Sequence, residues 1–473
     1  MNTKKTGHFF SREVKQSELK IAALCALLLI ALLVRIVFVF GSPVRVRNGF
    51  GQFGDSFFYH ISAYNLYKGN GFSAIDDGRA FGFSPQAEKL NYGPAITRGP
   101  VYPFFISLVY RFFSNPKDML AITTWHLNWD RVRLAQCIVD TITCLLVFLI
   151  VRLIYPTSWW PAFISAALYA LSFYNIFYTR TLLSESINTF LVTLSLLCTV
   201  AAFKTQKRWL WLLSGVSFGL TVLSRLEHVL FLIVVCAYLL FLNRRTVLKK
   251  VIFLLLGVAI IIAPWTFRNY AVFKKFVLVS TGSLGYSLYL GTFEGNDAPV
   301  GWGNFPDTLF RSKQERRQVE GYYQLYDSNL RLGSMAVKEA DDFFLNLALR
   351  RIRENPFQCF KSWVTKAPRL WYQNYIPMYG EKEAPGVFFI FYFLCAAYSF
   401  RASTKEERIL TGFIWLLFIY LNLIFLPLHI EPRYSVYVMP GIICLSGIGV
   451  WKVFILFRGR FKASHAASID ATR

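Results

Sequence analysis

The stretch from residue 54 to residue 72, GDSFFYHISAYNLYKGNGF, begins with a glycine and an acid and ends with two glycines around an aromatic-rich centre. Its apolar side chains recur at helical spacing, at Phe57, Phe58, Ile61, Tyr64 and Leu66. Asp55 suits the N-cap of such a helix, and Gly69 or Gly71 suits the turn that ends it. A helix of roughly four turns with this many polar residues is too polar to cross a bilayer. The pattern therefore predicts a short amphipathic helix at a membrane interface.

The composition of the chain is that of a membrane protein. Of its 473 residues, 55% are hydrophobic and 18% are aromatic, which is unusual for a soluble domain. Apolar runs recur along most of the chain and predict an all-α polytopic membrane protein with about ten transmembrane helices. The runs lie at residues 19–40, 132–153, 161–178, 184–203, 210–223, 229–242, 251–267, 387–400, 409–426 and 436–457.

The basic residues indicate the orientation of these spans. The chain has 51 Lys and Arg against 27 Asp and Glu, a formal net charge of +24. Threading the spans in order places the basic loops on one side, which the positive-inside rule makes cytoplasmic. These loops are the N-terminus, Arg152, 204–208, 244–250, 401–408 and 458–462. No soluble basic domain is present to hold nucleic acid, and seven of the eight cysteines lie in apolar runs, so no disulfide framework is expected.

The threading predicts five parts of the chain. They are a cytoplasmic N-terminus at 1–18, a transmembrane module at 19–267 with an outer loop at 41–131, a large extracytoplasmic loop at 268–385, C-terminal spans at 386–457, and a cytoplasmic tail at 458–473. The first span, with lysines and arginines before it, is interpreted as an uncleaved signal anchor. Residues 101–113 are too few to span a bilayer, so we interpret them as a second interfacial or re-entrant helix on the outer side.

The same threading brings the costly polar residues of the span borders to the outer side. They are Asp55, His60, Arg98, Arg131, Arg180, Glu185, Arg225, Glu227, Arg268, Glu431 and Arg433. Charges at such positions usually face a cavity or one another, and arginines suit a phosphate through bidentate donors. Structural roles are the alternatives: Asp55 as a helix cap, Arg268 as a border anchor, and His60 as a packed core residue.

Several of these residues stand in short motifs that follow one another in a fixed order. The motifs are Asp55-x3-Tyr59-His60, Arg98-Gly-Pro100, Leu183-Ser-Glu185, Leu-x-Arg225, Pro264-Trp-x2-Arg268 and Arg433-Tyr434. In this order they resemble the GT-C superfamily of integral-membrane glycosyltransferases. The resemblance is to the bacterial group related to the aminoarabinose lipid A transferase and to the protein O-mannosyltransferases of family 39. It covers most of the chain, although Arg225-Leu226 stands where the family has Arg-Pro.

The resemblance implies transfer of a sugar, with inversion, from a polyprenyl-phosphate donor to a lipid, glycan or protein of the cell envelope, at the outer face of the cell (inner) membrane. Asp55 is then the expected catalytic base. The expected donor-phosphate ligands are Arg268, Arg98, Arg225 and Arg433, and Glu185, His60 and Tyr59 are the candidates for positioning sugar or acceptor. No cofactor is implied. A two-carboxylate metal site lacks support, because Gly54 precedes Asp55 where some mannosyltransferases have a second acid.

Two other classes of function fit part of the pattern. A transporter or flippase for a lipid-linked or anionic solute would also use an arginine-rich cavity. However, the polar residues gather at one face rather than at mid-membrane on broken helices, and no inverted repeat is visible. A membrane scaffold would not require six loops to converge on Asp55.

Overall fold

The computed structural model describes residues 3–41, 55–75, 92–113, 125–242, 244–281, 283–294, 305, 309–331, 334–372 and 385–470. The membrane-type helices are α1 (Thr3–Phe40), α5 (Trp125–Ile154), α6 (Trp160–Ala170), α7 (Phe173–Arg180), α8 (Glu185–Thr205), α9 (Arg208–Ser224), α10 (His228–Leu242), α11 (Arg244–Phe273), α17 (Pro385–Arg401), α18 (Lys405–Phe425) and α19 (Met439–Asp470), with the 3-10 helix η5 (Pro432–Val438) before α19. Each of the ten predicted apolar runs is helical in the structure, which confirms the all-helical fold class.

The helices differ in whether they are long enough to cross a bilayer. Among the described residues, six are long and apolar enough: α1, α5, α8, α11, α18 and the η5–α19 unit. A seventh is reached if α6 and α7, bent by 45° at a short break, count as one span. This is fewer than the about ten predicted. The difference lies in α9, α10 and α17, whose described lengths of 17, 15 and 17 residues are at or below the lower end of the range for a transmembrane helix.

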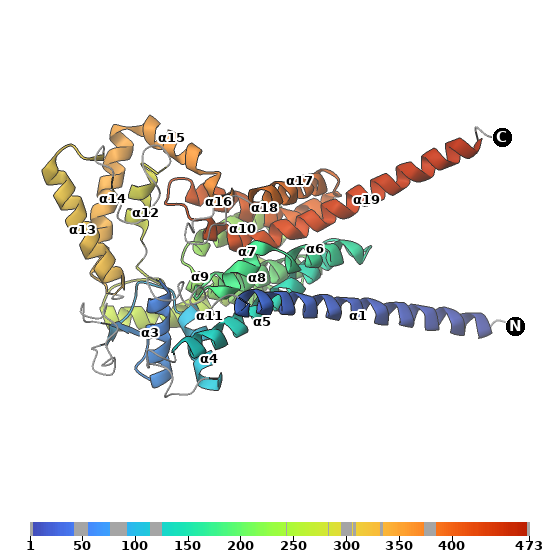
Figure 1. Cartoon of the computed structure of the whole chain (residues 1–473), viewed down its shortest axis with the longest axis horizontal. Coiled ribbons are helices and arrows are strands. Elements are labelled where there is room, and N and C mark those ends of the chain that lie inside the picture. Colours follow the sequence, from blue (N-terminus) through green and yellow to red (C-terminus); the bar gives the residue numbers. More distant parts are fainter. Residues whose placement is uncertain are drawn as a thin grey trace.

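Most of the remaining elements gather at one end of the bundle (Figure 1). They are α3 (Asp55–Lys68), the antiparallel pair β1 (Ser73–Ile75) and β2 (Tyr92–Pro94), α4 (Val101–Phe113), α12 (Leu284–Gly291), α13 (Lys313–Arg331), α14 (Val337–Glu354) and α15 (Pro356–Lys366). The short helix α16 (Arg369–Tyr372) instead packs on η5 and α17 of the bundle. The ends of α1 and α19 that lead to the two termini extend from the opposite side of the bundle. We refer to the end that holds α3, α4 and α12 to α15 as the outer end.

Helix α3 occupies the position predicted for the first outer helix. It starts at Asp55 and stops at Lys68, where Gly69 and Gly71 take positive φ angles of 85° and 75°. Residues other than glycine rarely adopt positive φ angles, so the two glycines end the helix. Its surroundings differ from the prediction, because residues 58–65 are all buried rather than buried on one face. The cause is that α4 and the β1–β2 pair pack over it, so its polar face is covered by protein.

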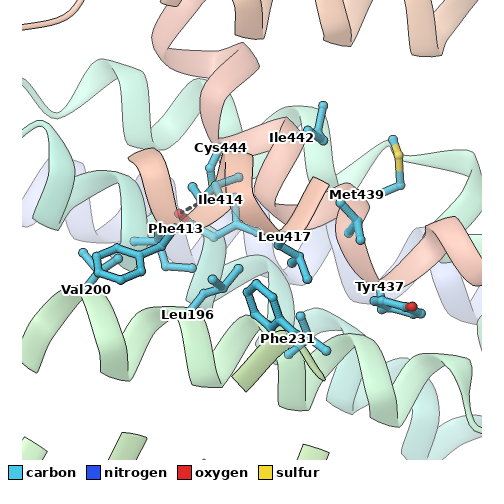
Figure 2. Packing of buried hydrophobic residues seen from close by; sticks show 14 of the residues in the cluster. Leu196, Val200, Phe231, Phe413, Ile414, Leu417, Tyr437, Met439, Ile442 and Cys444 are labelled. Carbon is cyan, nitrogen blue, oxygen red and sulfur yellow. Dashed lines mark hydrogen bonds between the residues drawn. The ribbon is translucent and has the colours of Figure 1, made fainter. Parts of the chain in front are cut away.

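The core of the bundle is made where helices distant in sequence meet (Figure 2). Leu196 and Val200 of α8 and Phe231 of α10 lie against Phe413, Ile414 and Leu417 of α18, with Ile442 and Cys444 of α19 behind them. A separate aromatic core holds the outer helices together, with Tyr286 and Tyr289 of α12 packed on Phe344 of α14 at centroid distances of 4.9 and 5.4 Å.

A buried ion pair attaches the first span to the bundle. The Nε atom of Arg35 in α1 donates to Oδ2 of Asp140 in α5 at 2.5 Å, and the Tyr169 hydroxyl of α6 donates to Oδ1 at 2.5 Å. The exposed fractions of the two charged side chains are 0% and 1%. Helix α1 otherwise has little buried surface, with 17% of its apolar window inside the protein. The pair therefore fixes the position of a helix that has few other contacts.

Removing one partner of this pair leaves an unpaired buried charge. We expect Arg35→Met to lower the free energy of unfolding by about 3–5 kcal/mol, because the carboxylate of Asp140 then lacks its counter-ion. The double variant Arg35→Met with Asp140→Asn removes both charges and keeps an acceptor for Tyr169, so it should lose much less. Thermal unfolding in detergent measures both. Equal stability of wild type and the single variant would show that the pair does not hold α1.

Candidate active site

Asp55 is the centre of a charged cluster at the outer end. It occupies the first turn of α3, where the helix dipole favours a negative charge. Its Oδ1 accepts hydrogen bonds from Nη2 and Nε of Arg98 at 2.6 and 3.1 Å, and its Oδ2 accepts one from Nη1 of Arg433 at 3.3 Å. One carboxylate thus joins the first outer helix, the loop before α4 and the segment before the last span.

The backbone places Arg98 beside the end of α9. Gly99 follows Arg98, and a Cβ atom at Gly99 would lie 2.1 Å from the carbonyl oxygen of Leu223 and 2.8 Å from that of Ser224. Only glycine allows this approach, so Gly99 sets the loop directly against the residue before Arg225. This close backbone contact explains the glycine of the Arg98-Gly-Pro100 motif.

A second acid–arginine pair adjoins Asp55. Glu185 is the first residue of α8, and its Oε1 accepts a hydrogen bond from Nη2 of Arg225 at 2.7 Å. The same oxygen lies 3.9 Å from Nη1 of Arg433, so Arg433 stands between Asp55 and Glu185. Glu185 is 1% exposed, and its Oε2 has no hydrogen-bond partner among the described residues. This buried carboxylate oxygen can therefore still accept a hydrogen bond.

Two further acids, Glu431 and Glu227, belong to the cluster. Glu431 lies 2.5 Å from Nε of Arg433, and Glu227 lies 3.5 Å from Nη1 of Arg225. The guanidinium groups of Arg225 and Arg433 both stack near the Tyr434 ring, each 5.5 Å from its centroid. Each of the three arginines is therefore paired with carboxylate. The predicted arginine-rich site is, in this state, a network of alternating charges.

The cluster is enclosed on the side of Glu185 and open on the side of Asp55. The side chains of Asp55 and Arg98 are 24% and 21% exposed. Burial would raise the pKa of Asp55, but the charges of Arg98, Arg433 and Arg225 outweigh it and hold that pKa well below its usual value. Asp55 is therefore an anion at neutral pH, and it is a weak base while both arginines bind it.

Two of the predicted site residues lie elsewhere. His60 is 4% exposed, and its Nδ1 is 2.7 Å from the Tyr110 hydroxyl of α4 and 3.4 Å from Nε1 of Trp129 in α5. Burial lowers the pKa of His60 to about 4, so the ring is neutral. On a helix the position five residues after Asp55 points about 140° away from it. His60 thus packs α3 against α4 and α5, whereas Tyr59, four residues after Asp55, shares its side of the helix.

Arg268, at the end of α11, does not contact Asp55. Its guanidinium donates to the carbonyl oxygens of Phe72 and Ala95 at 2.8 and 2.9 Å. It also lies 5.1 Å from the centroid of the Trp265 ring. Phe72 and Ala95 flank the β1–β2 pair and are joined by a backbone hydrogen bond of 3.1 Å. Arg268 therefore fixes the loop that leads to Arg98. Among the described residues it has no carboxylate partner.

Glu431 and Glu227 were part of the outer-side charge list but not of the predicted site. Their positions two residues from Arg433 and Arg225 are the sequence signal, since short-range acid–arginine pairs are common at helix ends. In the part of the chain that the structure describes, no group of three His, Cys, Asp or Glu side chains has an arrangement suited to a metal ion.

Comparison with known proteins gives one sequence match and several structural ones. Residues 97–267 match a family described as dolichyl-phosphate-mannose-protein mannosyltransferase. A search of curated proteins gives no match. The matched range holds four of the clustered side chains, Arg98, Glu185, Arg225 and Glu227, and ends one residue before Arg268.

Solved structures give matches of different strength. The archaeal oligosaccharyltransferase AglB from Archaeoglobus fulgidus, in complex with an inhibitory peptide and a dolichol-phosphate, matches with a TM-score of 0.53 and 14% identity over 93% of this chain. Its apo form matches with a TM-score of 0.55, also at 14% identity and over 93% of this chain. ArnT from Cupriavidus metallidurans bound to undecaprenyl phosphate has a TM-score of 0.36 and 13% identity, over 90% of this chain and 76% of ArnT.

The AglB likeness concerns the fold alone at this level of identity, and this chain covers 52% of the length of AglB. Together with the sequence match it confirms the resemblance drawn from the motifs. The chain has the helical membrane fold of the GT-C glycosyltransferases, and its residues 97–267 match their dolichyl-phosphate-mannose-protein mannosyltransferase branch.

Proposed function

We propose that this chain is an inverting glycosyltransferase that moves a sugar from a polyprenyl-phosphate donor to an acceptor of the cell envelope. The observation that carries the proposal is the position of Asp55 between Arg98 and Arg433, beside the Glu185–Arg225 pair, at one end of a GT-C bundle. A carboxylate and three guanidinium groups within reach of one another are the groups that such a transfer needs.

The proposed reaction exchanges one bond at the anomeric carbon for another. The acceptor oxygen attacks that carbon, its proton passes to Asp55, and the bond to the phosphate oxygen breaks with its electron pair on the phosphate. A glycosidase needs a carboxylic acid to protonate the leaving oxygen. A phosphate leaves as an anion, so it needs cations in place of a proton donor, and Arg98, Arg225 and Arg433 supply them. Inversion follows from a single displacement.

The ion pairs also suggest how donor binding prepares the base. In the free site Asp55 is paired with two arginines, which holds its pKa low. A donor phosphate competes with the carboxylates for the same guanidinium groups. As Arg98 and Arg433 turn toward the phosphate, the pKa of Asp55 rises toward the range of a useful base. Glu185, with its open Oε2, and Tyr59 remain the candidates for positioning sugar or acceptor, and Arg268 remains a candidate phosphate ligand.

The orientation that we propose places the outer end outside the cytoplasm of a cell (inner) membrane. The first outer loop at 41–131 and the large loop at 268–385 then face the exterior, and the segments 1–18 and 458–473 are cytoplasmic. The ends of α1 and α19 that point away from the Asp55 site fit this arrangement (Figure 1). The polyprenyl chain of the donor would lie among membrane lipids against the spans.

Replacement of the base should separate chemistry from binding. Asp55→Asn is expected to lower sugar transfer by at least about 100-fold, because it removes the proton acceptor, while polyprenyl-phosphate binding persists. Arg98→Gln and Arg433→Gln should weaken that binding about tenfold or more. The measurements are transfer from a radiolabelled polyprenyl-phosphate sugar into membranes and binding of the lipid phosphate to purified protein. Lys338→Gln, in an exposed ion pair of α14, is the control. Full transfer by Asp55→Asn would contradict the proposal, and solute movement without transfer would favour a flippase.

The pH dependence of catalysis should show whether Arg98 and Arg433 turn from Asp55 toward the donor phosphate. The acid limb of kcat/KM belongs to the free enzyme and that of kcat to the donor complex. Because the pKa of Asp55 is low in the free state and rises when the phosphate binds, the acid limb of kcat should lie at the higher pH. Steady-state rates between pH 4 and 8 should show the acid limb of kcat, whereas kcat/KM should stay level down to pH 4. Coinciding limbs would show that Asp55 keeps its arginines in the complex.

The orientation can be tested with single cysteines at exposed positions. Asn70→Cys, in the turn after α3, should react with a membrane-impermeant maleimide from outside intact cells. Lys405→Cys, at the start of α18, should react only after the membrane is opened. The protein without added cysteines is the control, because Cys25 is exposed among the native thiols. Labelling of both sites from the same side would overturn the topology.

A further inference from the structure

A second group of buried charges lies between the Asp55 cluster and the outer helices, and the reaction proposed above does not use it. It consists of Lys366 at the end of α15, Glu294 three residues after α12 and His429 before η5, together with Glu431, which is 16% exposed and also belongs to the Asp55 cluster. The exposed fractions of Lys366, Glu294 and His429 are 1%, 2% and 2%. We call these four side chains the relay.

The relay forms a continuous path to Asp55. One ring nitrogen of His429, Nδ1, contacts Oε1 of Glu294, and the other, Nε2, lies 3.3 Å from Oε1 of Glu431. Glu431 lies 2.5 Å from Nε of Arg433, and Nη1 of Arg433 lies 3.3 Å from Oδ2 of Asp55. The signs of the charges alternate along the path when His429 is protonated.

The other side of the relay is attached to the outer helices. Nζ of Lys366 donates to the carbonyl oxygens of Gly291 in α12 and Leu428 at 3.1 and 2.6 Å, and lies 3.9 Å from Oε2 of Glu294. The backbone N–H of His429 donates to the carbonyl oxygen of Ser287 in α12 at 2.8 Å. The segment that carries His429 and Glu431 is thus fastened to α12 and α15.

A cationic ring satisfies both side-chain contacts of His429. A neutral imidazole has one N–H donor, and its second nitrogen would turn a lone pair toward a carboxylate. An imidazolium donates from both nitrogens and satisfies Glu294 and Glu431 together. Lys366 cannot replace it, because its nearest contacts are two carbonyl oxygens.

The charges around the ring agree with this assignment. Burial would lower the pKa of His429, but the charge of Glu294 and the hydrogen bonds to Glu294 and Glu431 outweigh it and raise that pKa to about 9. The cations near this group are Lys366 on α15, which lies by Glu294, and Arg433, which lies by Glu431. Burial also lowers the pKa of Lys366, to about 8, despite the charge of Glu294.

We propose that His429 is a positioning residue for sugar transfer. As an imidazolium it holds the carboxylate of Glu431, and Glu431 in turn fixes the guanidinium of Arg433 beside Asp55. Through Glu294 and Lys366 the same contacts make the orientation of Arg433 depend on where α12 and α15 lie. The role in transfer rests on the proposed function, since it assumes that Arg433 stabilises the departing phosphate.

The pH window follows from the direction of the shift. A group whose pKa is raised on folding contributes its full stabilisation below its unfolded pKa, here 6.5, and loses it as the pH rises through the folded pKa, here about 9. Transfer should therefore have an alkaline limb near pH 9. Above it the ring is neutral and no longer holds both carboxylates.

The protonation state can be measured without any activity. The chain has six histidines, so the ring signals of protein labelled with ¹³C-histidine are few, and the one missing in His429→Gln belongs to His429. In the wild-type protein this signal should remain that of an imidazolium until about pH 9. In Glu294→Gln its midpoint should fall, because one carboxylate is gone. A wild-type ring that is neutral at pH 7 would overturn the proposal, whether or not the chain transfers sugar.

Kinetics then test the effect on the reaction. His429→Gln should lower kcat between about 10- and 100-fold with a smaller change in the KM for the donor, since a small displacement of Arg433 acts on the transition state. His429→Arg keeps a permanent cation, so it should retain most of the activity and lose the alkaline limb. Glu294→Gln should move that limb to lower pH without removing a side chain that contacts Arg433.

A buried histidine outside the relay provides the matched control. His228 of α10 has Nε2 at 3.1 Å from Oδ1 of Asn188 and does not contact the relay. His228→Gln should keep the pH profile of the wild type. An unchanged profile and kcat in both His429→Gln and Glu294→Gln, with transfer intact in the wild type, would show that His429 has only a packing role. Absence of transfer in the wild type would count against the proposed function and leave the titration result standing.

Discussion

The outer end of this protein depends on one carboxylate that two arginines share. Asp55 and Arg433 are separated by 378 residues, and their contact joins the first outer helix to the segment before the last span. Without the Asp55 charge, three guanidinium groups would stand close together with fewer anions between them, and like charges in a partly buried site repel strongly. The groups proposed to carry the chemistry are therefore also the groups that assemble the end of the bundle.

The features predicted correctly from the sequence are those that depend on local pattern. The ten apolar runs became helices because hydropathy and length act within a single segment. Asp55 starts α3 and two glycines end it, since helix ends are set by a few neighbouring residues. The gathering of Asp55, Arg98 and Arg433 at one end also followed from the sequence, because threading the spans fixes the side on which each loop lies.

The features that the sequence did not predict depend on contacts between distant segments. Arg268 and Arg98 both stand in motifs, but only the fold shows that the Arg268 guanidinium meets two backbone carbonyls while Arg98 meets Asp55. Likewise α3 looked like an interfacial helix, and its burial results from α4 and the β1–β2 pair covering it. The described parts of α9, α10 and α17 are shorter than the other spans, and only their packing in the bundle shows where they lie.

The contact between Arg35 and Asp140 has a consequence for how the chain is made. Asp140 follows Arg35 by 105 residues, so at about 5–20 residues per second the ribosome needs roughly 5–20 seconds to supply the counter-ion. During that interval Arg35 of the first helix lacks its counter-ion Asp140. Arg35 stands five residues from the end of its helix at Phe40, which is near enough for its long side chain to reach the headgroups. The guanidinium of Arg35 in nascent α1 can thus stay at the headgroups until α5 is made and Asp140 pairs with it.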